Sequence, residues 1–155
     1  MVAERLQAAA ANLTPPYAVV DLDALDPNAQ AMITRARGLP IRLATKSIRC
    51  RAIINRVLDR SGYQGALAYS LAEAIWLARS GIQDILLAYP TVDREALVNL
   101  AQDDQLRESI MVMVDSIEQR DLIDNAAATQ PIKVCIDVDA SLRIGPLHLG
   151  VRRSP

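Results

Sequence analysis

The chain has 155 residues, of which 51% are hydrophobic and 23% charged, with a formal net charge of −1. This length and apolar content suit a folded domain with its own core and exclude a disordered chain. The near-neutral charge and the lack of a Lys or Arg stripe argue against nucleic-acid binding. No run of about 18 apolar residues is present to span a membrane.

The first residues, MVAERLQAAAANLTPP, predict a short helix that is stopped by Pro15 and Pro16. Glu4 and Arg5 interrupt the basic-then-apolar order that a signal peptide needs.

The cysteine and histidine content indicates the cellular compartment and whether a metal site is to be expected. Cys50 and Cys135 lie far apart and have no Cys or His neighbours at metal-ligand spacing. His148 is the only histidine, so a histidine-based metal site is not expected. We therefore expect a reduced, cytoplasmic protein without a bound metal.

Short β-branched or Leu-rich runs alternate with helical patterns along the rest of the chain. The candidate strands are 17–21, 41–45, 65–69, 84–88, 110–114 and 132–138. The helical stretches between them lie near 24–37, 48–60, 71–80, 93–102 and 117–127.

Residues typical of helix ends support these boundaries. SLAE (70–73) predicts a capping box, in which Ser70 caps the helix and Glu73 returns to the backbone of the cap. Asp93 and Ser116 are expected to cap their helices. Glycines that suit a left-handed C-terminal position follow three helical stretches: Gly38, Gly62 and Gly81.

From the second candidate onward, strand centres recur about every 19 to 26 residues, which suits one strand and one helix per repeat. This alternation predicts an α/β fold with a parallel sheet, either open or closed into a barrel. A complete (βα)8 TIM-type barrel takes about 250 residues. We interpret the chain as an incomplete barrel with about five strands (39–155), preceded by a helix, a lead-in strand and a second helix (1–38). A small open doubly wound sheet is the alternative.

Alternation along IRLATK places Arg42, Ala44 and Lys46 on one face of their strand. In the next repeat we expect Ala66 and Ala68 on the corresponding small face, which would line the inside. Lys46 is then expected to point inward at the carboxyl end of its strand, where βα proteins keep their chemistry.

Two interpretations of Lys46 follow from its position. One is a solvated lysine at a strand end. The other is a lysine whose neutral amine attacks a carbonyl inside a partly closed pocket. Ala44, Ala68 and Ala88 would leave room there for a flat cofactor. Arginines that lie near Lys46 in the sequence are candidates to hold an anion: Arg42, Arg49 and Arg51.

The segment IRLATKSIRC resembles the lysine segment of fold-type III pyridoxal phosphate enzymes, particularly the D-threonine aldolase and D-serine deaminase-like group. In those aldolases an Arg-Pro-His-x-Lys-Thr-His stretch carries the cofactor lysine. Arg42 and Lys46 match this arginine and lysine at the same spacing, whereas Ala44 and Ile48 occupy the histidine positions.

The resemblance extends over nearly all of the chain, from about Thr14 onward. VVDLDALDPNA (19–29) is similar to the entry segment of alanine racemases. Residues 70–93 are similar to the second and third barrel repeats, and CIDVDASLRIGP (135–146) resembles the strand that ends in Arg-x-Gly. The likeness points to the amino acid deaminase/aldolase branch, with a barrel like the N-terminal domain of alanine racemase.

The resemblance implies roles for individual residues. Lys46 would bind pyridoxal 5'-phosphate covalently. Arg143 would lie near the phenolic oxygen of the cofactor and keep it ionised, although a solvent-facing arginine is the alternative. We expect Tyr69 and Tyr89 to pack at the barrel mouth, and Tyr69 is also a candidate cofactor contact.

Two carboxylates, Asp137 and Asp139, alternate with apolar residues after the last predicted strand. We expect them to cap the strand end and to pair with Arg143 rather than to bind a metal, because the metal ligands of the resembled family lie in its C-terminal domain.

The resemblance implies a pyridoxal phosphate-dependent enzyme that acts on a small amino acid by deamination, retro-aldol cleavage or racemisation. The absent histidines weaken the retro-aldol alternative. No Gly-rich phosphate cradle and no second catalytic base are found up to Pro155, so we expect the chain to be the N-terminal part of a longer enzyme. In the family the second base is supplied across a homodimer. A non-catalytic pyridoxal phosphate-binding protein and an inactive truncated product are the other hypotheses.

Overall fold

The computed structural model describes residues 2–127, 130–138 and 140–150. The chain divides into two compact units, Met1–Pro40 and Ile41–Pro155. Within the described part of the chain, the search for helices of sufficient length and hydropathy to cross a membrane found none.

The first unit consists of helices α1 (Val2–Ala10) and α2 (Leu22–Ala36) and the segment between them. Asp21 caps α2, because its carboxylate accepts a hydrogen bond from the Asp23 backbone N–H at 3.1 Å. Arg5 of α1 forms ion pairs with both Asp21 and Asp23, so electrostatic contacts tie α1 to the start of α2.

The lead-in strand expected at 17–21 is wrong. These residues adopt no regular secondary structure, and the side chains of Tyr17, Val19 and Val20 are 43–49% exposed. β-branched residues favour strands chiefly through packing against neighbours, and no strand of the described chain pairs with this segment. The prediction of a helix before the prolines is confirmed, since α1 ends at Ala10, ahead of Pro15.

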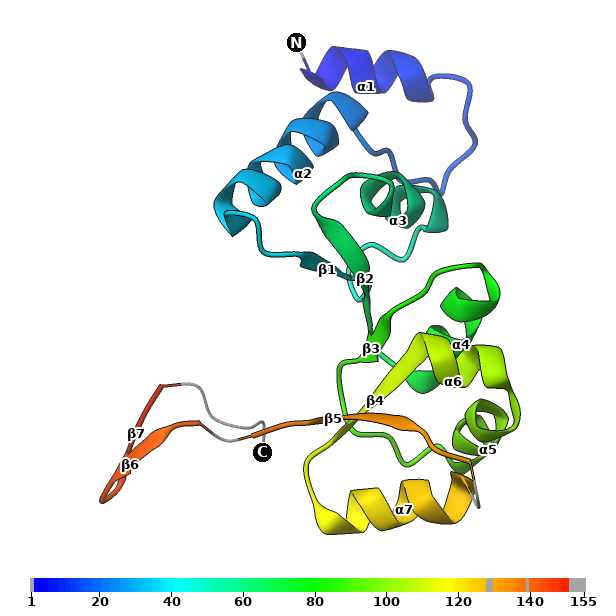
Figure 1. The fold of residues 1–155 in the computed structure, drawn as a ribbon. Coiled ribbons are helices and arrows are strands. Elements are labelled where there is room, and N and C mark those ends of the chain that lie inside the picture. The colour runs from blue at the N-terminus through cyan, green and yellow to red at the C-terminus, as the bar shows by residue number, and fades with distance from the viewer. Residues whose placement is uncertain (1, 128–129, 139, 151–155) are drawn as a thin grey trace. The chain divides into compact units, whose positions relative to one another are not determined.

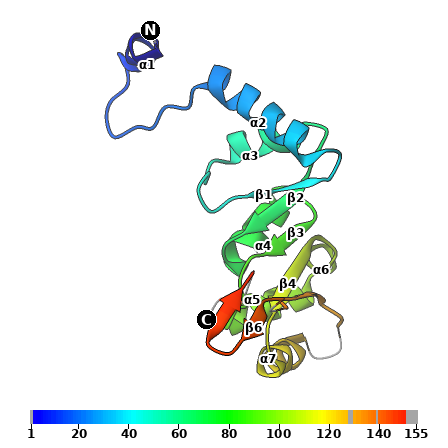
Figure 2. The ribbon, with the colours of Figure 1, turned by 90° about the vertical axis from the view of Figure 1, so that its left-hand side faces the viewer.

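The second unit is built on a parallel sheet in the order β1-β2-β3-β4-β5, which is also the chain order (Figures 1 and 2). The strands are β1 (Ile41–Ala44), β2 (Tyr63–Ala68), β3 (Ile85–Leu87), β4 (Ile110–Val114) and β5 (Lys133–Ile136). The connecting helices are α3 (Arg51–Leu58), α4 (Leu71–Arg79), α5 (Arg94–Gln102), α6 (Asp104–Ser109) and α7 (Ile117–Ala127). Consecutive βα repeats with neighbouring strands are the arrangement of a partial TIM-type barrel, as predicted.

The helix caps predicted from the sequence are confirmed at three helices. The Ser70 hydroxyl accepts from the Glu73 backbone N–H at 3.3 Å, and the Asp93 carboxylate accepts from the Ala96 N–H at 3.0 Å. The Ser116 hydroxyl accepts from the Gln119 N–H at 3.3 Å. These bonds satisfy N–H groups that a helix leaves without an internal partner.

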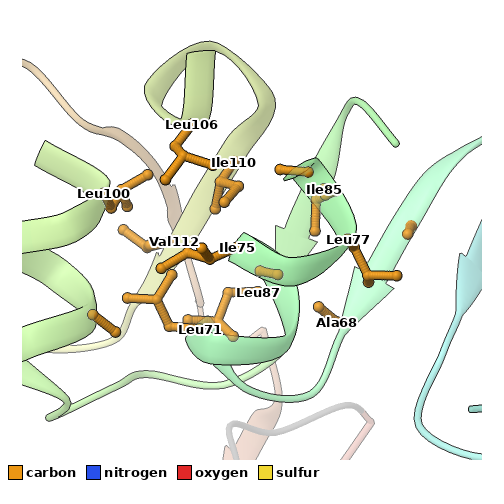
Figure 3. Packing of buried hydrophobic residues seen from close by; sticks show 14 of the residues in the cluster. Ala68, Leu71, Ile75, Leu77, Ile85, Leu87, Leu100, Leu106, Ile110 and Val112 are labelled. Carbon is orange, nitrogen blue, oxygen red and sulfur yellow. The ribbon is translucent and has the colours of Figure 1, made fainter. Parts of the chain in front are cut away.

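One face of the sheet and the helices enclose the hydrophobic core (Figure 3). The strands contribute fully buried Ala, Ile, Leu and Val side chains, and α4 and α5 contribute most of the helix side. The residues shown in Figure 3 include Ala68, Leu71, Ile75, Leu77, Ile85, Leu87, Leu100, Leu106, Ile110 and Val112. Burial on this scale makes the helix-covered face the main source of hydrophobic stability.

The predicted facing of β2 is wrong. Ala66 and Ala68 have no exposed surface and belong to the core, so they face the helices instead of the interior side. The register pairs Leu43 with Ala66 and Ala44 with Leu67, which places Leu67 on the same face as Ala44. Small side chains are needed where α4 packs closely on the sheet, and the larger Leu side chains of α4 fill that space.

A bulge in β2 fixes this register. Between Ile41 and Leu43 of β1, the partner residues on β2 advance from Tyr63 to Ala66, so the paired residues shift by one. Gly65 lies within the bulge at a φ of +68°, and a Cβ atom there would meet the Asp84 carbonyl oxygen at 2.0 Å. Only glycine suits this position.

The opposite face of the sheet carries no helix within the described residues. A row of paired residues crosses the middle of this face, one from each of four neighbouring strands: Ala44, Leu67, Leu86 and Met111. Ala44 is exposed, and the other side chains of this row are only partly buried. This open face corresponds to the interior of a TIM-type barrel.

Three elements were not predicted: α6 and the two strands of a hairpin after β5. α6 follows α5 after the single residue Asp103, whose carboxylate accepts from the backbone N–H groups of Gln105 and Leu106 and so starts a new helix. The segment after β5 forms an antiparallel hairpin of β6 (Leu142–Ile144) and β7 (Leu147–Leu149), joined by a turn at Gly145. Alternating apolar residues around Gly-Pro are the sequence signal for this hairpin.

Candidate functional site

Lys46 lies in a turn that directly follows β1. The backbone N–H groups of Ile48 and Arg49 both donate to the Thr45 carbonyl oxygen, at 3.1 and 3.2 Å. Arg49 has a φ of +42°, and its Nε donates to the Lys46 carbonyl oxygen at 3.1 Å. The backbone of the lysine is therefore held from both sides, while its side chain is exposed.

The amine of Lys46 lies over two tyrosine rings. Its Nζ atom is 5.3 Å from the centroid of the Tyr69 ring and 5.9 Å from that of Tyr89. The two rings meet edge to face, with their centroids 5.5 Å apart and their planes at 75°. Lys46, Tyr69 and Tyr89 each follow the carboxyl end of their strand, which is the end of the sheet where the tyrosines were expected to pack. No carboxylate of the described chain forms an ion pair with Lys46, and the ring faces are its electrostatic partners.

A part-buried contact joins the side chains of Thr45 and Glu73 next to the Tyr69 backbone. The Thr45 side chain is fully buried, and its hydroxyl is 2.9 Å from Glu73 Oε1 and 3.3 Å from the Leu67 carbonyl oxygen. Glu73 Oε2 accepts from the Tyr69 backbone N–H at 2.9 Å. The predicted return of Glu73 to the Ser70 backbone is thus wrong by one residue, because its carboxylate reaches the residue before the cap.

Arg42 lies away from Lys46, at the opposite end of β1. Its guanidinium donates to the Asp84 carbonyl oxygen at 2.9 Å and to both carboxylate oxygens of Asp84, at 2.9 and 3.0 Å. The side chain crosses Gly65, which has no side chain to block it. Asp84 itself has a φ of +53°, and the contacts from Arg42 help to hold this conformation. Arg42 therefore binds an internal carboxylate and not an anion beside Lys46.

Of the three alanines expected around Lys46, two lie near it and one does not. Ala44 lies on the same open face, one row below Tyr69, and Ala88 follows β3 at the level of Tyr69. The expectation for Ala68 is wrong, because its side chain is buried under α4.

Arg143 lies in β6 of the hairpin, and its side chain is exposed. Among the contacts of the described residues, none joins Arg143 to Lys46 or Tyr69, and its cofactor contact stays a prediction. Asp137 lies just beyond β5, where its backbone N–H donates to the Val114 carbonyl oxygen at 2.8 Å. Asp139 and the His148 side chain lie outside the described residues.

A pocket of about 460 Å³ opens beside the Tyr69 backbone, between the starts of α3 and α4. It is lined by Arg49, Ile54, Tyr69, Ser70, Glu73 and Trp76. Trp76 is the only tryptophan of the chain and is 51% exposed. No sequence signal pointed to Trp76 or to the Thr45 side chain, because Trp76 lines this pocket from α4 and the Thr45 hydroxyl contacts Glu73 of the same helix.

No group of three or more His, Cys, Asp or Glu side chains that would suit a metal ion occurs within the described residues.

Comparisons with known proteins agree with this architecture. The family model for the alanine racemase N-terminal domain matches residues 20–152. The crystal structure of D-threonine aldolase from Filomicrobium marinum is similar, with a TM-score of 0.71 and 30% sequence identity. That similarity covers 82% of this chain and 35% of the aldolase chain, so the chain spans about a third of the aldolase's length. A search of curated proteins found no significant match. The family match over most of the chain, together with the sheet of consecutive βα repeats, shows that the chain belongs to the alanine racemase N-terminal domain family of fold-type III pyridoxal phosphate enzymes.

Proposed function

We propose that this chain belongs to a pyridoxal phosphate-dependent amino acid enzyme and that Lys46 is the lysine that binds the cofactor. The observation that carries the proposal is the position of the Lys46 amine, which stands over Tyr69 and Tyr89 at the carboxyl ends of three neighbouring strands. Chemistry in βα barrels occurs at this end. Members of the family are typically pyridoxal phosphate-dependent.

The residues around Lys46 fit a flat aromatic aldehyde. The amine has no carboxylate partner within the described chain, so covalent attachment breaks no ion pair. The two tyrosine rings supply an aromatic surface next to the amine. Ala44 is small and exposed in the row below, which leaves the open face accessible beside the lysine.

Bound pyridoxal phosphate supplies an electron sink for negative charge at the substrate α-carbon. The contributions of this chain are attachment, orientation and proton transfer. Lys46 Nζ would hold the cofactor and would be placed to carry a proton to or from the α-carbon of a bound substrate. Tyr69 and Tyr89 orient the amine and shield it from water on one side.

We further propose a lyase acting on a small D-amino acid. The similarity to a D-threonine aldolase favours this branch over racemisation. The absence of histidine at Ala44 and Ile48 favours deamination over retro-aldol cleavage within it.

The site of cofactor attachment can be tested directly, because the sequence contains two lysines, Lys46 and Lys133, and a label can be assigned to one or the other. The purified chain is incubated with pyridoxal phosphate and reduced with borohydride, which makes the lysine–cofactor bond permanent. Peptide mapping is expected to place the label on Lys46. The amine of Lys133 donates to the Glu108 carbonyl oxygen and is expected to react poorly.

Charge-preserving variants provide the matched controls. Lys46→Arg is expected to abolish specific labelling, whereas Lys133→Arg is expected to leave it unchanged. Label on Lys133 or on the α-amino group instead of Lys46 in the folded protein would refute the assignment.

Turnover separates the reaction types. The loaded protein is incubated with D-serine, D-threonine and D-alanine, and keto acid, aldehyde and the L-enantiomer are measured separately. Keto acid from D-serine is the expected product, and the L-enantiomer alone would overturn the lyase proposal in favour of a racemase. Specific loading of Lys46 without any product would favour the non-catalytic binding protein.

A further inference from the structure

Glu73 connects the segment that carries Lys46 to the segment that carries Tyr69. It lies in the first turn of α4, and its carboxylate contacts residues from two different strand ends. Oε1 accepts from the hydroxyl of Thr45, which directly precedes Lys46, at 2.9 Å. Oε2 accepts from the backbone N–H of Tyr69, whose ring lies under the Lys46 amine, at 2.9 Å.

We propose that Glu73 is a positioning residue, which sets the placement of the Lys46 amine over the Tyr69 ring by linking Thr45 to the Tyr69 backbone. This inference rests on the proposed function of Lys46. Glu73 does not touch the amine itself, and it acts through the backbone of the turn on one side and that of Tyr69 on the other.

The chemistry of the linkage suits a carboxylate. Each of its oxygens accepts one hydrogen bond, and bonds to a charged acceptor are stronger than neutral ones. The first turn of a helix also favours a negative charge. Thr45 is fully buried and Glu73 is half-buried, so water competes less for the Thr45–Glu73 bond than for the exposed bond from the Tyr69 N–H. The link therefore restricts the relative motion of the ends of β1 and β2.

Glutamine at this position preserves the geometry without the charge. Its carbonyl oxygen accepts from the Tyr69 N–H, and its amide donates to the Thr45 oxygen. The Thr45 hydroxyl then turns to the Leu67 carbonyl oxygen, which already lies 3.3 Å away. Glu73→Ala removes both contacts, and Thr45→Val removes only the contact on the lysine side.

The test compares the reactivities of Lys46 and Lys133 within the same molecules. Wild type and variants are labelled with pyridoxal phosphate and borohydride, and in parallel with acetic anhydride, which requires only an accessible amine. In Glu73→Ala the Lys46-to-Lys133 ratio for pyridoxal phosphate is expected to fall about tenfold, as loss of a charge-assisted bond implies. The ratio for acetylation is expected to stay the same. Thr45→Val should show a smaller fall, and Glu73→Gln should restore most of the wild-type ratio.

Glu95→Ala is the matched control, because Glu95 is an exposed carboxylate in the first turn of α5. It changes the charge at a helix start without touching the site, and its labelling ratios should equal those of wild type. An unchanged pyridoxal phosphate ratio in Glu73→Ala, or an equal fall in both ratios, would overturn the positioning role. Absence of Lys46 labelling in the wild type would instead refute the proposed function, so the two failures are distinguishable.

Discussion

Replacement of Gly65 by alanine is expected to destabilise the chain severely. The glycine has a φ of +68°, and an added Cβ would lie 2.0 Å from the Asp84 carbonyl oxygen. That oxygen accepts from the Ala66 N–H at 3.1 Å and from Arg42 Nη1 at 2.9 Å. The Asp84 carbonyl must move to admit the methyl group, and both hydrogen bonds are then lost or distorted.

The cost is the sum of a conformational part and a contact part. A left-handed conformation costs a non-glycine residue about 1–2 kcal/mol. Loss of the backbone hydrogen bond costs about 1 kcal/mol, and loss of the bond from the charged guanidinium about 2 kcal/mol. The total of about 4–5 kcal/mol is a large part of the roughly 5–15 kcal/mol by which ordinary domains are stable.

Urea denaturation followed by circular dichroism measures this loss of unfolding free energy. Gly81→Ala is the matched control, because Gly81 has a φ of +93° and nothing within 4 Å of an added Cβ. We expect about 1–2 kcal/mol for the control, from the conformational part alone. Equal losses in the two variants would refute the role of the Asp84 carbonyl. A Gly65→Ala chain that fails to fold beside a folded control would support it.

Three further changes test the packing and the site. Ala68→Leu is expected to cost about 1–3 kcal/mol by overpacking the core under α4, whereas Ala44→Leu on the open face should change the unfolding free energy by less than about 0.5 kcal/mol; equal costs would contradict the facing of β2. Arg42→Met is expected to cost about 2–3 kcal/mol in the same denaturation assay, because it removes the bond to the Asp84 carbonyl oxygen together with an ion pair that is about one-third exposed and partly screened, and an Asp84→Asn background should reduce that cost. Tyr69→Ala should weaken pyridoxal phosphate binding several-fold in an absorbance titration, and Tyr69→Phe should not, because the ring face and not the hydroxyl contacts the amine.

The sequence predicted the repeat architecture well, for reasons that are local. The run IMVMV has β-branched residues and neighbouring helix signals, and its predicted bounds agree with β4 (Ile110–Val114). Caps at Ser70 and Asp93 fixed the starts of α4 and α5. Such signals lie within a few residues of the feature that they predict.

The facing of β2 was not predictable in the same way. Alternation says which residues share a face, but it does not say which face meets the helices. The expectation that the small face lines the interior was wrong at Ala66 and Ala68, since both side chains are buried in the core on the helix-covered face. The need for glycine in the bulge at Gly65 depends on the Asp84 carbonyl, which comes from the residue before β3. The positions of Lys46 and Tyr69 at the carboxyl ends of their strands were predictable, while the link through Glu73 and Thr45 depends on the three-dimensional arrangement of two strands and a helix.

The strand that precedes Lys46 is paired on one side only, since β1 stands at the end of the sheet and β2 is its neighbour within the described chain. Its release breaks the ladder with β2, the bonds from the Ile41 and Thr45 N–H groups to the carbonyls of Gly62 and Leu67, and the contacts of Arg42 with Asp84. The amide protons of β1 should therefore exchange with solvent through local fraying, whereas those of β3 should exchange only when the whole sheet opens. If a ligand attaches to Lys46 only while β1 is paired with β2, its free energy of binding adds to the free energy of the local opening that exposes the β1 amides to exchange.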